Sequence, residues 1–168
     1  VAGGVMHVSY NDPTNSPQTL AKAVKDITAG YADASLVEAL SSNAGRAVHW
    51  LKSEGAGFAI ATNAGWRNWV LAPVRPSVTQ MEWKGLGADL ALRTLEKNLA
   101  ARGGALHRNT QGVDLLMDNG RCVGVRARQG AAEQTFRARA VLLADGGFQA
   151  NQQMAGQHLT PAPGALKQ

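Results

Sequence analysis

The sequence lacks several features that would assign it to a class of protein directly. It contains one cysteine, Cys122, among 168 residues, so no disulfide can form within the chain. Cys122 stands in the apolar run Cys122–Val125, which favours a buried structural thiol over a catalytic one. A single cysteine with no disulfide partner is typical of a reducing setting, so we expect a cytoplasmic location. No apolar run reaches the roughly 18 residues that a membrane-spanning helix needs, so we expect no membrane partner.

Aromatic residues and patterned charge are also scarce. Aromatic side chains make up 5% of the chain, and 17 basic against 12 acidic residues give a net charge of +5. The basic residues are scattered and are not interleaved with aromatic ones, so we expect no nucleic-acid partner. The four histidines have no metal-ligand spacing, and we expect no metal site. These histidines are His7, His49, His107 and His158.

What is present in the first half indicates helices. Ser16-Pro17 is typical of an N-cap followed by proline at the first helical position, and the apolar spacing after it predicts a helix over about 16–29. Ser35–Glu38 has the spacing of a capping box and predicts a second helix over about 36–54. Gly55 is suited to end this helix, because glycine adopts the left-handed conformation easily.

In the second half the apolar period changes from that of a helix to that of strands. A helix is predicted over about 87–102, and a strand over 105–117 follows it. Asp118-Asn119-Gly120 is typical of a hairpin turn. Returning strands are predicted at 121–128 and 133–137.

One further strand is predicted at 140–144. This run, Ala140–Ala144, is wholly apolar, as in strands buried on both faces of a parallel sheet. Asp145-Gly146-Gly147 follows it directly. Ligands of open α/β sheets bind at the carboxyl ends of such strands, and glycine lets the backbone approach a cofactor closely. The same reasoning applies to Gly3-Gly4, although each glycine pair alone fits a tight turn equally well.

In this order of elements, residues 85–151 resemble the FAD-binding part of the fumarate reductase/succinate dehydrogenase flavoprotein superfamily. The resemblance is carried by the segments Gly87–Leu95, Ala101–Gly104, Asn109–Leu116, Asp118–Val125 and Ala138–Asn151. Gly3–Met6 resembles the family's glycine-rich stretch beside the flavin. Residues 46–83 look most like the tricarballylate dehydrogenase branch.

The resemblance implies an α/β fold, namely part of an FAD-binding Rossmann-like domain with a three-stranded β-meander and packed helices. We expect one incomplete domain over 1–168, with a helical and irregular part (1–84), a helix, meander and buried strand (85–151) and a tail (152–168). The implied cofactor is FAD. The implied cofactor-binding residues are Gly3, Gly4, Val5, Gly112, Val113, Ala144, Asp145, Gly146 and Gly147.

The resemblance also implies what the chain does not contain. The family's G-x-G-x-x-G fingerprint occurs nowhere in the sequence and would precede Val1, while the catalytic His and Arg of the family would follow Gln168. The family usually has Thr or Ser where this chain has Asp145, which leaves the role of that carboxylate open. We therefore expect an internal piece of a longer enzyme, inactive alone, with no assignable catalytic residue.

The expected reaction of the parent enzyme is hydride transfer between flavin N5 and a small polycarboxylate or enoate. Two alternatives remain at this point. One is a non-catalytic α/β interaction module that binds no FAD, and the other is a piece of a ketosteroid dehydrogenase-like flavoenzyme. Because the strand at 140–144 lacks neighbours in this sequence, we also expect that the fragment pairs with another copy, rearranges, or is a stable remnant of a longer chain.

Overall fold

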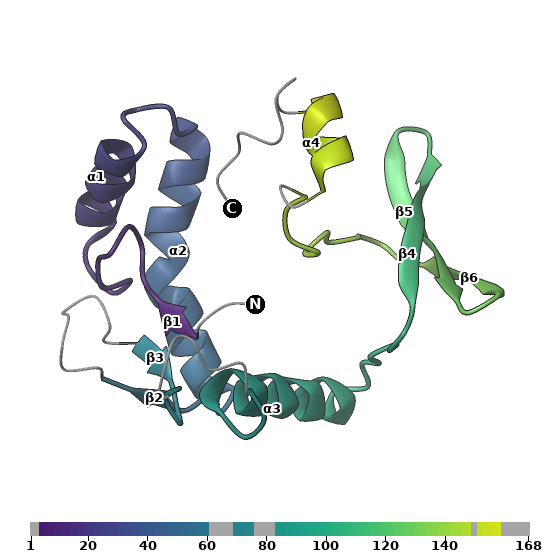
Figure 1. The fold of residues 1–168 in the computed structure, drawn as a ribbon, viewed down its shortest axis with the longest axis horizontal. Helices are drawn as coiled ribbons and strands as arrows, with labels where there is room; N and C mark the ends of the chain where they lie inside the picture. Colours follow the sequence, from purple (N-terminus) through teal and green to yellow (C-terminus); the bar gives the residue numbers. More distant parts are fainter. Residues whose placement is uncertain (1–3, 61–68, 76–82, 149–150, 159–168) are drawn as a thin grey trace. The chain divides into compact units, whose positions relative to one another are not determined.

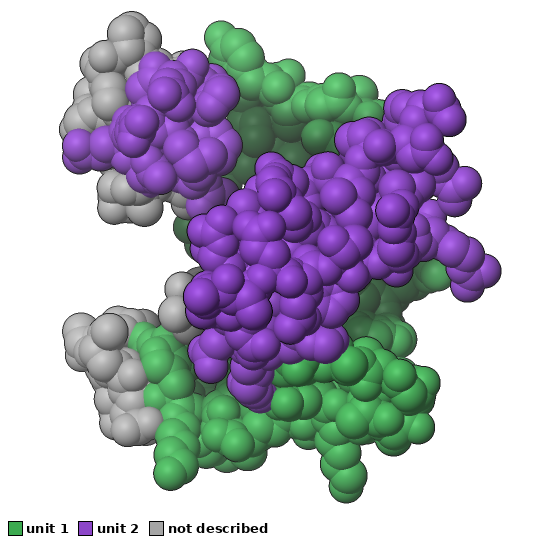
Figure 2. Space-filling view, turned by 90° about the vertical axis from the view of Figure 1, so that its right-hand side faces the viewer, with its two compact units in different colours: residues 1–106 green, residues 107–168 purple. Residues whose placement is uncertain are grey.

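The structure is a computed structural model, and it describes residues 4–60, 69–75, 83–148 and 151–158. The chain divides into two compact units, residues 1–106 and residues 107–168, which are coloured separately in Figure 2. Together they contain helices and antiparallel strands, consistent with an α/β FAD-binding domain.

Two helices that lie side by side form the first core of unit 1 (Figure 1). The first, α1, spans Pro17–Ile27, and α2 spans Ala34–Ser53. The predicted N-cap of α1 is confirmed, because Ser16 Oγ accepts a hydrogen bond from Thr19 N at 3.2 Å. The apolar side chains between the two helices remove their surface from water and stabilise the pair. The buried cluster comprises Val8, Leu20, Val24, Val37 and Ala44.

The start of α2 differs from the prediction. The capping residue is Asp33, whose Oδ1 accepts hydrogen bonds from Ser35 N at 2.9 Å and from Leu36 N at 3.1 Å. Ser35 Oγ donates to the same carboxylate at 2.5 Å, so Ser35 is not the cap. An aspartate two residues upstream satisfies the free N–H groups better, because its charge also interacts favourably with the helix dipole. The predicted end is confirmed, with Gly55 at a φ of +95°.

A small sheet and a third helix form the second core of unit 1. Strands β1 (Val5–Met6), β2 (Phe58–Ala59) and β3 (Trp69–Leu71) pair antiparallel in the order β1-β3-β2. Helix α3 spans Gly87–Ala101 and packs on β3. A Cβ on Gly87 would lie only 2.1 Å from Leu71 O, so glycine is required for this close approach.

Unit 2 contains a three-stranded antiparallel sheet whose strands follow one another in chain order. Strand β4 spans Gln111–Asp118, β5 spans Arg121–Gln129 and β6 spans Ala132–Arg137. The predicted turn between β4 and β5 is confirmed, since Asn119 and Gly120 have φ of +47° and +79°. Helix α4, Gln152–His158, follows near the end of the described residues.

The strand predicted over 105–117 is confirmed from Gln111 onward but is wrong at its start, and the strand predicted over 140–144 is wrong throughout. Residues 105–110 are not in a strand, because β4 begins at Gln111. Residues 140–144 form no strand either, and Leu142 and Leu143 are 89% and 66% exposed. A strand buried on both faces needs a pairing strand on at least one side and covering side chains, and the described residues supply neither to this segment.

Candidate functional site

A cavity in unit 2 lies between β4 and the apolar segment that follows β6. We refer to it as the β4 pocket. It has a volume of about 490 Å³, within the range of roughly 300–1,000 Å³ that is usual for small-molecule sites. Its lining residues are Gln111, Gly112, Val113, Asp114, Leu115, Val125, Leu142, Leu143, Ala144 and Asp145.

Four residues predicted from sequence meet in this pocket. Gly112 and Val113 come from β4, and Ala144 and Asp145 come from the segment after β6. They are about 30 positions apart along the chain, and β5 and β6 bring them together by returning the chain twice. The pocket therefore combines two segments that the sequence predicted as cofactor-binding one by one, without indicating that they lie together.

One edge of β4 remains available for a ligand. In the described part of the chain β4 pairs with β5 and with no other strand, so its second row of backbone N–H and C=O groups has no strand partner. Gly112 adds no side chain to this wall, and a Cβ there would lie 3.6 Å from Val125 Cγ1, at the pocket itself. Backbone donors and acceptors beside apolar side chains suit a flat heteroaromatic ring.

The charged side chains of the sheet are largely paired with one another. Arg126 donates to Asp114 on β4 and lies 3.5 Å from Glu133 on β6, and Arg128 lies 3.2 Å from Glu133. The Asp114 carboxylate accepts a hydrogen bond from Arg126 and thereby raises the pKa of its guanidinium further above its ordinary value. These exposed cross-strand pairs fix the register of the strands more than they add stability. Two carboxylates line the pocket, Asp114 and Asp145, and Asp114 is the one paired with Arg126.

The predicted glycines after the pocket have a different setting. Gly146 has a φ of +85°, and a Cβ there would meet no atom within 4 Å. Gly146 and Gly147 are exposed and do not line the β4 pocket. The positive φ of Gly146 reverses the chain just beyond Asp145, which is a conformation that other residues adopt at a cost.

The remaining predicted residues belong to unit 1. Gly4 has a φ of +79°, and its carbonyl oxygen accepts a hydrogen bond from Leu71 N at 2.8 Å. Val5 pairs with Val70 in the small sheet. Gly3 lies outside the described residues. Gly4 is therefore held against β3, in a backbone conformation that favours glycine.

Comparison with known proteins assigns the family. A protein family described as "FAD binding domain" matches residues 1–166. The chain belongs to this family of FAD-binding domains. FAD is accordingly the cofactor of the protein that contains this domain. The domain is also 30% identical over 137 residues to the NADH:acrylate oxidoreductase of Vibrio harveyi, an alignment that covers 77% of this chain and 12% of that relative. The chain thus spans a small part of its relative's length.

The chemistry of the β4 pocket fits part of FAD. Adenine needs backbone hydrogen-bonding groups at its edge and apolar contacts on its faces, and the open edge of β4 and the side chains of Val113 and Leu143 provide both. A pocket of about 490 Å³ cannot enclose the whole dinucleotide, so the fit concerns the adenosine end. Asp145 suits ribose hydroxyls, which donate to a carboxylate, better than it suits a phosphate, which would repel it.

Several pocket residues were not nominated by sequence reasoning. Leu115, Val125 and Leu142 line the cavity together with the residues predicted for it. A signal existed for Leu115, because Val113 and Leu115 stand two apart, which is the spacing of one face of a regular strand. For Leu142 the sequence pattern predicts a place in a buried strand, where its side chain could not contact a ligand.

The described residues form neither a metal site nor a membrane-spanning helix. Across the described ranges, no group of three His, Cys, Asp or Glu side chains is arranged to hold a metal ion. Of the helices in the same ranges, none is long and apolar enough to cross a membrane.

Proposed function

We propose that this domain is part of an FAD-dependent oxidoreductase that acts on a small enoate or polycarboxylate. The observation that carries the proposal is the family match over residues 1–166. The similar protein from Vibrio harveyi is named as an oxidoreductase of acrylate, which is an α,β-unsaturated carboxylate. That name supports an enoate, rather than a saturated polycarboxylate, as the substrate class. Membership of the tricarballylate dehydrogenase-like branch is a more specific proposal, which the name does not address.

The residues of this chain would bind and orient the cofactor. The backbone of Gly112 and Val113 would hydrogen-bond the adenine edge, while Ala144 and Asp145 would close the pocket on the ribose. Gly146 and Gly147 would let the chain pass close to the dinucleotide, because no side chain intervenes. Gly3, Gly4 and Val5 would lie beside the flavin. When bound, FAD supplies hydride transfer between N5 and a carbon of the substrate.

Catalysis is proposed to need residues beyond these 168. The sequence has no G-x-G-x-x-G motif, which in dinucleotide-binding domains places the pyrophosphate at a helix N-terminus. Proton transfer to an enoate also needs a positioned acid. The β4 pocket is proposed to hold the adenosine end of FAD, so the residues that line it would not be placed to protonate the substrate. We therefore expect the isolated chain to be inactive.

Self-association of the isolated chain is a second proposal. Leu142 and Leu143 are exposed next to the open edge of β4. Exposed apolar side chains beside an unpaired strand edge favour pairing with another chain. The longer protein would cover this surface by its own residues, so the proposal applies to the 168-residue chain alone.

The test of the proposed function uses the complete protein. Purified protein should be yellow with bound FAD, and reduced protein should be reoxidised when acrylate is added under anaerobic conditions. A colourless protein that binds no added FAD would favour the alternative of a non-catalytic interaction domain. Reoxidation by a 3-ketosteroid with an unsaturated ring, and not by acrylate, would favour the ketosteroid dehydrogenase-like alternative.

A further inference from the structure

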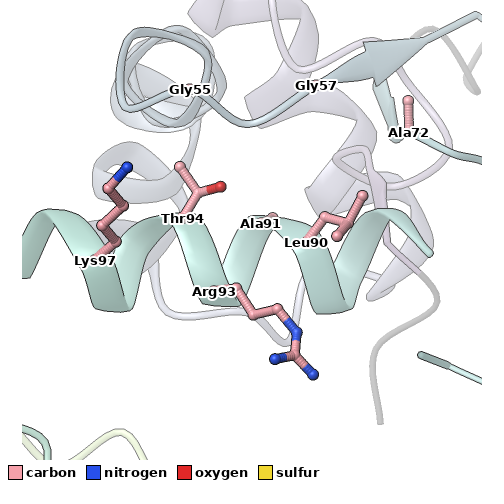
Figure 3. Close-up of a pocket in the computed structure, with 8 residues that line it drawn as sticks. All are labelled: Gly55, Gly57, Ala72, Leu90, Ala91, Arg93, Thr94 and Lys97. Atoms are coloured by element: carbon pink, nitrogen blue, oxygen red, sulfur yellow. The ribbon is translucent and has the colours of Figure 1, made fainter. Parts of the chain in front are cut away.

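A second cavity lies in unit 1, against one face of α3. We refer to it as the α3 pocket, and Figure 3 shows its lining. Its volume is about 460 Å³. It is an open cavity, bordered by α3 on one side and by the turn after α2 and the end of β3 on the other. The lining residues are Gly55, Gly57, Ala72, Leu90, Ala91, Arg93, Thr94 and Lys97.

The walls of this cavity are fixed to one another by contacts at its ends. A Cβ on Gly55 would lie 3.2 Å from Thr94 Cγ2, so the turn runs close to the helix. Beyond it, Asn98 Nδ2 donates to Glu54 O at 2.8 Å. At the other end, Gly87 N donates to Pro73 O at 2.8 Å. The cavity is therefore a formed feature of unit 1, and a ligand would meet little reorganisation cost.

Two carboxylates beside the walls of the cavity, Asp89 and Glu54, already have partners. Asp89 accepts from Arg93 Nε at 2.9 Å, and Arg93 points away from the turn in Figure 3. Glu54 accepts from Arg102 and from Asn98. These acids are neutralised where they stand, so they leave no free negative charge to compensate another cation.

Lys97 and Thr94 are the polar side chains that point toward the turn (Figure 3). Within the described ranges Lys97 makes no ion pair, and the Thr94 hydroxyl makes no hydrogen bond. One ammonium group and one hydroxyl therefore border a cavity whose other contacts are mostly apolar. The apolar contacts come from Leu90, Ala91 and Ala72.

We propose that the α3 pocket binds a small monocarboxylate with a short aliphatic chain. The carboxylate would pair with the Lys97 ammonium and accept a hydrogen bond from Thr94 Oγ1, and the aliphatic part would contact Leu90 and Ala91. A phosphate dianion fits less well, because one cation leaves half of its charge uncompensated. This site lies outside the β4 pocket, and the proposal does not depend on the proposed cofactor or reaction.

Titration of the ¹⁵N-labelled chain with butyrate tests the proposal. Butyrate should shift the amide signals of Gly55, Gly57 and Thr94 in a saturable way. Butyramide has nearly the same shape without the charge, and its affinity should be lower than that of butyrate by about tenfold or more. Inorganic phosphate should also bind more weakly than butyrate. Equal binding of butyrate and butyramide, tighter binding of phosphate, or no saturable shift would overturn the assignment.

Variants locate the binding at the two polar groups. Lys97→Gln should weaken butyrate binding about tenfold, and Thr94→Val should weaken it about threefold or more. Lys22→Gln is the matched control, because it removes one exposed helical charge that is paired with Asp26 elsewhere in unit 1, and it should leave the affinity unchanged. Circular dichroism would verify folding. Unchanged affinity in Lys97→Gln, or an equal loss in Lys22→Gln, would contradict the proposal.

Discussion

Glu54 and Arg102 form a two-point ion pair that joins the C-terminal ends of α2 and α3. Arg102 Nη1 donates to Glu54 Oε2 at 2.8 Å, and Nη2 donates to Oε1 at 2.9 Å. Asn98 Nδ2 adds a bond to Glu54 Oε2 at 2.9 Å. The Glu54 side chain is only 10% exposed, so its carboxylate depends on these partners. The bidentate geometry fixes the helix ends more firmly than a single contact would.

This pair should make stability depend on pH. The hydrogen bonds from Arg102, and then from Asn98, hold the pKa of Glu54 below its ordinary value. A lowered pKa in the folded state contributes stability above the ordinary glutamate range, and that contribution is lost as the pH falls through the lowered value. Glu54→Gln should therefore reduce Tm by a few degrees at neutral pH, and the difference from the wild type should shrink in acid.

Thermal unfolding followed by circular dichroism at several pH values would measure this effect. Glu38→Gln is the matched control, because it removes the same charge from an exposed position of α2. Its Tm should differ little from the wild type at any pH. A Tm difference for Glu54→Gln that is constant between neutral and acidic pH would contradict the linkage.

The α1–α2 core should depend on Leu20. Its side chain is fully buried, so Leu20→Ala removes apolar contacts and leaves a cavity that costs about 2–5 kcal/mol of unfolding free energy. Leu36→Ala on α2 is the control, because Leu36 is 70% exposed, and its effect should stay within about 0.5 kcal/mol. Urea unfolding measures both, and similar losses in the two variants would speak against this core.

The contact between β5 and β6 should not tolerate a side chain at Gly124. A Cβ there would lie 2.2 Å from Phe136 O, so Gly124→Ala must displace backbone and should destabilise the sheet by about 1–3 kcal/mol. Gly112→Ala is the comparison, because its Cβ would make an ordinary contact at 3.6 Å. It should change the unfolding free energy by less than about 1 kcal/mol. Equal stability of the two variants would contradict the described register.

A bulky side chain in the β4 pocket should impair cofactor binding without unfolding the sheet. Gly112→Leu would place its side chain where we propose adenine, and the affinity of the complete protein for FAD should fall about tenfold or more. Ala131→Leu adds the same side chain at an exposed position after β5 and should leave the affinity unchanged. Flavin fluorescence during titration measures both. Normal FAD affinity in Gly112→Leu would move the adenine site elsewhere.

The proposed self-association should depend on the exposed leucines. Leu142→Glu together with Leu143→Glu replaces apolar surface by charge beside β4, and the 168-residue chain should then be monomeric. Light scattering after size-exclusion chromatography gives the mass directly. Tyr31→Glu is the control, since Tyr31 is also exposed but lies in unit 1. A wild-type chain that is monomeric at all concentrations would refute the proposal.

Local elements of this protein follow from short stretches of sequence. Ser16-Pro17 determines the start of α1, Gly55 the end of α2 and Asn119-Gly120 the turn between β4 and β5. Each of these signals acts through backbone conformation or a nearby N–H group, so it needs no distant partner. The choice of Asp33 over Ser35 as the cap was missed because both residues can satisfy the same free donors.

Tertiary structure decided what depends on distant residues. The apolar run 140–144 has the composition of a buried strand, but the described residues provide no neighbouring strand, and Leu142 is exposed. Sequence nominated Gly112 and Asp145 separately, whereas only the folding of β4, β5 and β6 placed both at one cavity. The α3 pocket had no sequence signal at all, because Gly55 and Lys97 meet only when α3 packs beside the turn after α2. Local propensity is encoded within a few residues, while burial and pocket formation depend on which segments pack together.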